Sequence, residues 1–80
     1  MNSLHIIGRN VMALRKLRGL TQEELGKKAG LHKNYIGFVE RGERNLSVET
    51  IEVIAKALDV QPYLLWMEAF EAVFKKATYK

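Results

Sequence analysis

The sequence predicts an all-α fold, a compact bundle of five helices within 80 residues. Apolar residues recur at spacings of three and four along most of the chain, which is the period of an amphipathic helix. No run shows convincing strand alternation between apolar and polar residues. Residue types that begin and end helices separate these segments at short intervals. A chain of this length is expected to form one domain over residues 1–80.

The first helix is expected over about residues 4–18. Its apolar stripe consists of Ile7, Val11, Leu14 and Leu17, at spacings of four, three and three. Gly19 follows the stripe, and glycine is the usual residue where the backbone turns left-handed to end a helix.

Residues 21–42 read TQEELGKKAGLHKNYIGFVERG and predict two short helices joined by a turn. Thr21 and Glu24 have the spacing of a capping box, so a helix is expected over about 22–29. Gly30 ends it, because glycine tolerates a positive φ. Gly26 has no side chain beyond a hydrogen atom, so it allows the two helices to approach each other closely. A third helix is expected over about 33–41, and the arrangement is a helix-turn-helix, which typically docks in the major groove of DNA.

Two further helices are expected after a polar loop. Ser47 is a good N-cap for a helix over about 48–58, whose apolar residues are Ile51, Ile54, Ala55 and Leu58. Pro62 suits the first turn of a last helix over about 61–76. This last helix carries a long apolar stripe, for which a homodimer interface is favoured over purely internal packing. The predicted interface residues are Trp66, Phe70, Val73 and Phe74.

Composition excludes several classes of site. The chain has no cysteine, so it has neither disulfides nor thiolate metal sites. His5 and His32 lack metal-ligand partners at useful spacing, so no metal and no cofactor are expected. No signal peptide is recognised, and no stretch approaches the roughly 20 apolar residues of a membrane span. We therefore expect a cytoplasmic protein that does not contact a membrane.

The positive charge is concentrated in the first half of the chain. The formal net charge is +4. Residues 1–45 contain nine Lys and Arg against four Glu, whereas residues 46–80 contain four Lys against five acidic residues. A basic region that includes the helix-turn-helix favours a polyanionic partner. A merely solvated basic surface is the alternative if charge is considered alone.

The sequence resembles the Cro/CI-type (XRE) helix-turn-helix regulators over about residues 7–65. The resemblance lies in Arg15 and its surroundings, 19–25 (GLTQEEL), 29–30, 35–36, 40–42 and 46–60. Within this family the chain is most similar to restriction–modification controller proteins, which are small homodimers that bind operator DNA. The resemblance implies a lambda-repressor-like fold in which the second and third helices form the helix-turn-helix.

The start of the third helix holds the candidate base contacts. Lysine can donate to guanine O6 and N7, and asparagine can pair with adenine, so Lys33 and Asn34 are the first candidates. The alternatives are two solvated polar residues, or a phosphate contact in the case of Asn34. The resemblance places bases opposite the next turn as well, at Gly37 and Phe38. Gly37 has no side chain with which to read a base and would instead let the helix backbone come close to the groove. The Phe38 ring has two alternatives, covering a thymine methyl group or folding back onto the core.

The candidate contacts to the sugar–phosphate backbone surround that helix. The resemblance implies a phosphate contact at Gln22, next to free backbone N–H groups. Arginine forks match phosphate, which favours contacts from the loop after the third helix. For Tyr35, His32 and Ser47 a purely structural or exposed role is the alternative. The full set is Gln22, His32, Tyr35, Arg41, Arg44, Asn45 and Ser47.

Arg15 and Glu40 have a different expected role. The resemblance implies an internal salt bridge between them, which would join the first helix to the end of the third. This pair would orient the motif and would not contact DNA.

The expected function is a sequence-specific transcriptional regulator. Its partners would be double-stranded DNA and a second copy of the chain, and RNA polymerase is a further candidate. The alternatives are an antitoxin, a phage-type repressor, or a protein-interaction module that has lost DNA binding. An enzyme is not expected, because a Gly-rich phosphate loop, a Ser/His/Asp arrangement and clustered acids with catalytic roles are all missing.

Overall fold

The computed structural model describes residues 2–68, which are helical and contain no strand. Four α-helices, α1 (Ser3–Leu17), α2 (Gln22–Ala29), α3 (Lys33–Glu40) and α4 (Val48–Leu58), precede a 3₁₀ helix, η1 (Pro62–Trp66). The prediction of an all-helical protein is confirmed, and the first four helices begin and end within one residue of their expected bounds. None of the helices in residues 2–68 has the length and apolar character required to cross a membrane.

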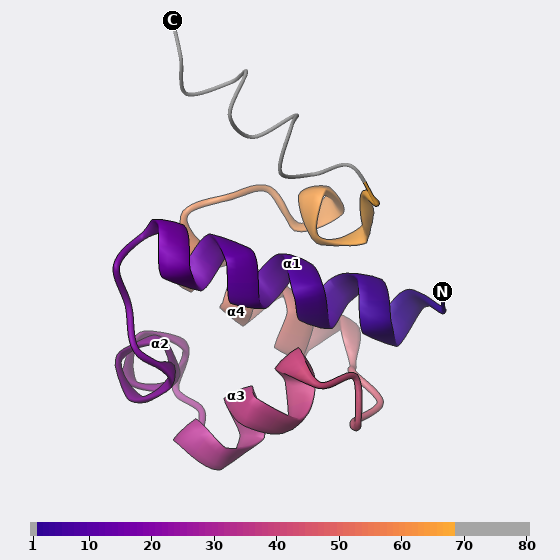
Figure 1. Ribbon diagram of the computed structural model, residues 1–80. Helices are drawn as coiled ribbons and strands as arrows, with labels where there is room; N and C mark the ends of the chain where they lie inside the picture. Colours follow the sequence, from indigo (N-terminus) through magenta and orange to yellow (C-terminus); the bar gives the residue numbers. More distant parts are fainter. Residues whose placement is uncertain (1, 69–80) are drawn as a thin grey trace, which may run out of the picture.

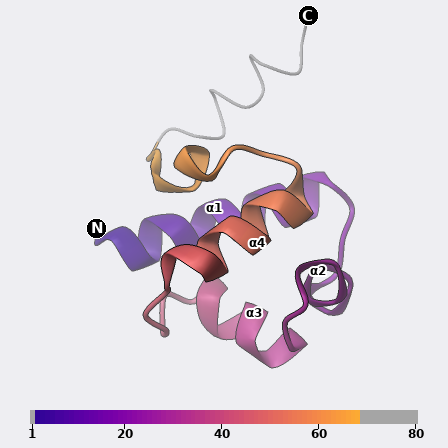
Figure 2. The same cartoon turned by 180° about the vertical axis from the view of Figure 1, so that it is seen from behind.

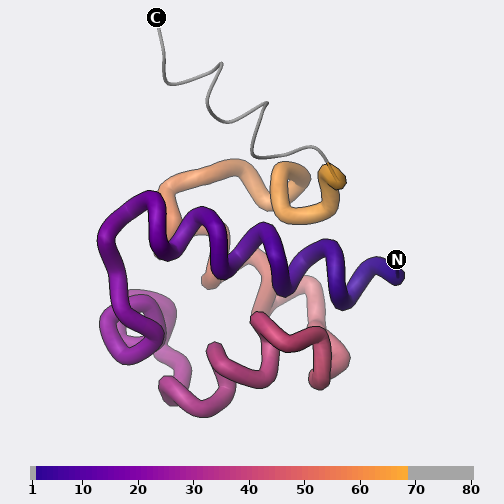
Figure 3. Tube along the Cα trace, in the orientation of Figure 1, coloured from indigo at the N-terminus to yellow at the C-terminus, as the bar shows by residue number. Residues whose placement is uncertain are grey.

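Helices α1 and α4 lie in the middle of the molecule (Figures 1 and 2). The α2–α3 pair packs on one side of them and η1 on the other. The trace in Figure 3 shows that the chain returns along α1 after α4, so η1 covers the side of α1 opposite α3. This arrangement leaves the outer side of α3 uncovered by any other described helix.

One apolar cluster joins all of these helices. The stripe of α1 is buried as expected at Ile7, Val11 and Leu14, but Leu17 is 52% exposed, so the prediction was wrong for its last member. The fully buried large side chains come from every element: Val11, Leu14, Leu25, Ile36, Val39, Ile54, Leu58 and Leu65. The core therefore fixes α2 and α3 relative to the two central helices.

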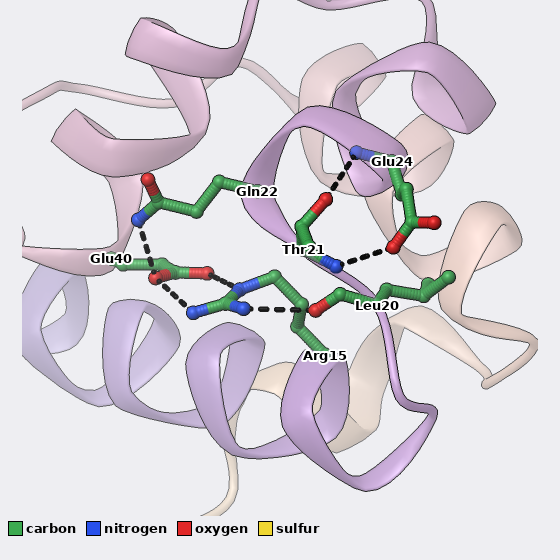
Figure 4. A network of polar contacts seen from close by, with 6 residues as sticks. All are labelled: Arg15, Leu20, Thr21, Gln22, Glu24 and Glu40. Atoms are coloured by element: carbon green, nitrogen blue, oxygen red, sulfur yellow. Dashed lines mark hydrogen bonds and ion pairs between the residues drawn. The ribbon is translucent and has the colours of Figure 1, made fainter.

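The ends of the helices follow the expected local chemistry. The Thr21 N–H donates to Glu24 Oε1 at 2.8 Å and the Glu24 N–H donates to Thr21 Oγ1 at 3.0 Å, which completes the capping box (Figure 4). Gly19 and Gly30 adopt φ values of 72° and 73°, so both turn the chain in the left-handed region as predicted.

Two glycines allow backbones to come into direct contact. A Cβ on Gly26 would lie less than 3.0 Å from the carbonyl oxygen of Leu31, which confirms that this glycine permits the tight α2–α3 turn. A Cβ on Gly8 would approach the carbonyl oxygens of Val39 and Glu40 just as closely. Gly8 therefore brings α1 against the end of α3, a contact that was not predicted from the sequence.

The chain after α4 departs from the predicted fifth α-helix. Pro62 begins η1 instead, and Met67 is extended with φ −85° and ψ 123°. The side-chain amide of Asn10, which is buried, donates to the carbonyl oxygens of Leu65 at 2.6 Å and Met67 at 3.0 Å. Because these bonds turn the carbonyls toward α1, an α-helix from residue 61 is wrong as far as residue 67. The expected continuation over residues 69–76 lies outside the described residues.

Arg18 connects the end of α1 to the end of α4. Its Nε donates to the carbonyl oxygen of Leu58 at 2.9 Å, and its Nη2 donates to that of Asp59 at 3.3 Å. Asp59 follows α4 with a φ of 61°. A cation placed on the last carbonyls of a helix is also favourable for the helix dipole.

Candidate nucleic-acid interface

Helix α3 has one face in the core and its polar start in solvent. Ile36 and Val39 are 0% and 1% exposed, whereas Lys33 and Asn34 at the beginning of the helix are exposed. The turn through Gly30 joins α2 to α3, and α2 does not lie over the beginning of α3 (Figure 1). The two residues predicted to read bases are therefore presented together at an accessible helix terminus.

The start of α3 is capped by a histidine. His32 Nδ1 accepts a hydrogen bond from the Asn34 N–H at 3.0 Å, in the place where Ser, Thr or Asp is the usual cap. An accepting Nδ1 assigns the ring hydrogen of a neutral imidazole to Nε2. The ring can then satisfy a backbone amide through one nitrogen and offer a donor through the other.

Four residues form a polar network beneath the motif (Figure 4). The ion pair expected between Arg15 and Glu40 is present, with Arg15 Nε 2.6 Å from Glu40 Oε2 and Arg15 Nη2 3.1 Å from Glu40 Oε1. Arg15 Nη1 also donates to the Leu20 carbonyl at 2.9 Å. Gln22 Nε2 adds a third bond to the carboxylate, to Oε1 at 3.0 Å.

This network joins the two helices of the motif to α1. The Glu40 side chain is 1% exposed and the Arg15 side chain 12% exposed, so both charges are largely removed from water. Through Glu40, the end of α3 is held against α1 and against the first residue of α2, Gln22. One amide hydrogen of Gln22 is committed to Glu40, and its second amide hydrogen is the donor that a phosphate contact would use.

Gly37 lies under two polar side chains. A Cβ on this buried glycine would lie 3.2 Å from Arg41 Nη1 and 3.7 Å from both side-chain amide atoms of Gln22. A base contact at Gly37 stays a prediction, and it requires these side chains to move aside.

The Phe38 ring lies under arginine side chains. The guanidinium carbon of Arg44 is 4.5 Å from the ring centroid and that of Arg41 is 5.1 Å away. Arg41 Nε also lies 3.0 Å from Glu43 Oε1 in an exposed ion pair. Phe38 is half-buried, but it is not among the described residues that pack against the core cluster. Neither alternative predicted for Phe38 anticipated these contacts.

The other predicted contact residues have varied surroundings. Tyr35 packs partly against the core, and Asn45 is exposed in the loop after α3. Ser47 caps α4 by accepting the Thr50 N–H at 3.1 Å. Of the predicted dimer residues, Trp66 is 44% exposed. The remaining three, Phe70, Val73 and Phe74, lie outside the described residues.

The sequence profile of the helix-turn-helix family matches residues 11–65, which span α2, α3 and α4. The chain belongs to the helix-turn-helix family. It is thereby a DNA-binding transcriptional regulator of this type, as its sequence predicted.

Several helix-turn-helix relatives carry the name of control proteins. The chain is 44% identical to control protein C.SmaI of Serratia marcescens, over 81% of this chain and 79% of that protein. It is 43% identical to control protein C.BamHI of Bacillus amyloliquefaciens, over 71% and 72% of the two chains. The crystal structure of the restriction-modification controller protein C.AhdI from Aeromonas hydrophila matches with a TM-score of 0.75 and 44% identity, over 78% of this chain and 94% of that one. The predicted resemblance to controller proteins is confirmed.

Proposed function

We propose that this chain is the controller protein of a restriction–modification system, which binds a roughly palindromic operator as a homodimer. The observation that carries the proposal is the exposed pair Lys33–Asn34 at the start of a helix whose opposite face is fixed in the core. In DNA-bound helix-turn-helix proteins, residues at this end of the second motif helix contact base edges. The similarity to two control proteins and to C.AhdI supports this class of regulator.

In the proposed complex α3 enters the major groove. Lys33 would donate to guanine O6 and N7, and Asn34 would pair with adenine N6 and N7. The loop after α3 would follow the sugar–phosphate backbone with Arg44 and Asn45, and the start of α2 would place Gln22 near a phosphate. The base contacts would select the sequence and the backbone contacts would hold the helix in register.

Two subunits would place two copies of α3 on one face of the duplex. Such helices read half-sites separated by about one turn of DNA, ~34 Å. The interface would include Trp66, whose side chain is substantially exposed, together with Phe70, Val73 and Phe74. The bound dimer would either block RNA polymerase or recruit it.

Lys33→Ala is expected to weaken binding to the preferred duplex by ~1–3 kcal/mol and to relax base preference at its position. The protein would be titrated against a short duplex that wild type selects from a random pool and against a scrambled duplex of the same composition. Lys27→Ala is the matched control, because Lys27 is an exposed lysine on α2. This control should weaken both duplexes slightly and equally. Equal affinity of the wild type for the two duplexes would contradict sequence-specific binding.

Trp66→Ala is expected to shift the protein from dimer toward monomer without DNA. The replacement removes a large apolar side chain from the proposed interface. Analytical ultracentrifugation over a concentration series measures the change. Tyr63→Ala is the control, since Tyr63 is another exposed aromatic residue of η1, at 63% exposure, outside the proposed interface. A wild type that sediments only as a monomer at tens of micromolar would refute the interface.

The assignment to a restriction–modification system has its own test, which is the identity of the neighbouring genes. An adjacent methyltransferase and endonuclease would support the controller function. A toxin gene would support an antitoxin instead, and phage genes a lysogeny repressor.

A further inference from the structure

We infer that Phe38 is a positioning residue for Arg44 and is not a base reader. This inference rests on the proposed DNA-binding function. The ring would hold the guanidinium where it can meet the sugar–phosphate backbone beside the groove that α3 enters. The same ring would also position Arg41.

The contacts of Phe38 support a role at the surface. The neighbouring residues Ile36 and Val39 fill the core below α3, at 0% and 1% exposure. Phe38 is only half-buried and lies on the side of α3 that faces the loop after it, since both arginines over its ring come from that loop. Within residues 2–68, the aromatic ring is therefore covered by cations and not by the core cluster.

Stacking on an aromatic ring and binding a phosphate use different parts of a guanidinium. The planar group places its face on the ring, where the electrostatic attraction lies, while its N–H bonds point outward in the plane. Those N–H bonds stay available for a bidentate contact with phosphate oxygens. Arg44 can therefore remain on Phe38 and bind DNA at the same time.

The two arginines differ in how their charge is balanced. Arg41 has Glu43 as an ion-pair partner at 3.0 Å. No carboxylate lies within ion-pair distance of Arg44 in the part of the chain that the structure describes, residues 2–68. Arg44 lies in a stretch without regular structure, where its side chain would otherwise sample many rotamers. A ring that restricts it beforehand lowers the entropy lost on binding.

The competing role for Phe38 is contact with a thymine methyl group. For a methyl contact, the ring would have to leave the guanidinium groups of the two arginines and pack against the base. The gain in affinity would then depend on the sequence of the duplex. A ring that positions Arg44 would instead raise the affinity for all duplexes alike, because phosphates are present in every sequence.

The test compares Phe38→Leu with Phe38→Tyr, which keeps the aromatic face. Each variant is titrated over a range of salt concentrations against the selected duplex, the scrambled duplex, and the selected duplex with deoxyuridine in place of thymidine. We expect Phe38→Leu to bind all three roughly three- to tenfold more weakly, with a salt slope flattened by up to about one unit. Phe38→Tyr should match the wild type, and deoxyuridine should not change wild-type affinity.

Arg44→Ala provides the coupling measurement. It should weaken binding strongly in the wild type but only slightly in the Phe38→Leu background, because the ring acts through this arginine. Equal circular dichroism and unfolding midpoints would show that the variants are folded. Additive effects of the two substitutions would overturn the inference.

The duplexes separate this inference from the proposed function. A loss confined to the selected duplex and reproduced by deoxyuridine would show that Phe38 reads a methyl group, so the inference would fail while sequence-specific binding stood. If the wild type bound selected and scrambled duplexes equally, the proposed function would fail. The affinities of Phe38→Leu and Phe38→Tyr could still be compared on either duplex, so the inference would still be tested. A wild type that bound neither duplex would refute both.

Discussion

Glu40→Ala should destabilise the protein by about 3–5 kcal/mol, since it leaves a largely buried arginine without its counterion. The Arg15 side chain is 12% exposed, so water cannot fully replace the lost carboxylate. The substitution also removes the acceptor of Gln22 and with it the bond between the start of α2 and the end of α3. Urea unfolding monitored by circular dichroism measures the loss as a lower midpoint.

An exposed ion pair supplies the control. Glu43→Ala breaks the Arg41–Glu43 pair, whose side chains are 53% and 51% exposed, and should cost no more than about 1 kcal/mol. The double variant Arg15→Met with Glu40→Leu should be far more stable than Glu40→Ala, because it removes both buried charges together. If the double variant were as unstable as Glu40→Ala, the cost would come from lost packing and not from an unpaired charge.

Gly8→Ala should destabilise the fold by about 1–3 kcal/mol, although alanine is the better helix former. A methyl group at this position would press on the carbonyl oxygens of Val39 and Glu40, which belong to backbone and cannot rotate away. Helix α1 would have to withdraw from the end of α3, where Glu40 accepts the bonds of Arg15. Thermal and urea unfolding would both register the change.

Gly37→Ala is the matched control for this prediction. Gly37 is also a helical glycine, but a Cβ there would meet only the flexible ends of Arg41 and Gln22, at 3.2 Å and 3.7 Å. Alanine should therefore be neutral or should raise stability by up to about 1 kcal/mol. A Gly8→Ala protein as stable as Gly37→Ala would mean that α1 and α3 can separate without cost.

The sequence predicted most accurately those features that depend on neighbouring residues. The capping box of Thr21 and Glu24 and the left-handed glycines Gly19 and Gly30 are set by contacts within a few positions, so four helices were predicted within one residue at each end. The exposed start of α3, with Lys33 and Asn34, followed from the predicted helix-turn-helix and the expected beginning of its second helix. The Arg15–Glu40 pair came from family resemblance, because nothing local links residues so far apart.

Features that depend on distant backbone could not be predicted in the same way. Gly8 contacts carbonyls at the end of another helix, and Arg18 reaches the end of α4. For Asn10 a signal existed, since it lies three residues after Ile7 and four before Leu14, on the buried stripe. The apolar period after residue 61 suggested an α-helix, but periodicity carries no information about donors elsewhere in the fold, such as the Asn10 amide, that redirect the carbonyls.

The Asn10 side chain holds the C-terminal segment through main-chain oxygens alone. Every residue type possesses a carbonyl, so substitution at position 67 leaves its acceptor in place, whereas Leu65 of η1 must remain apolar to fill the core. The outer surface of this segment is therefore free to diverge among relatives. In the proposed dimer, new pairing preferences could therefore evolve on this surface while α2 and α3 keep their arrangement.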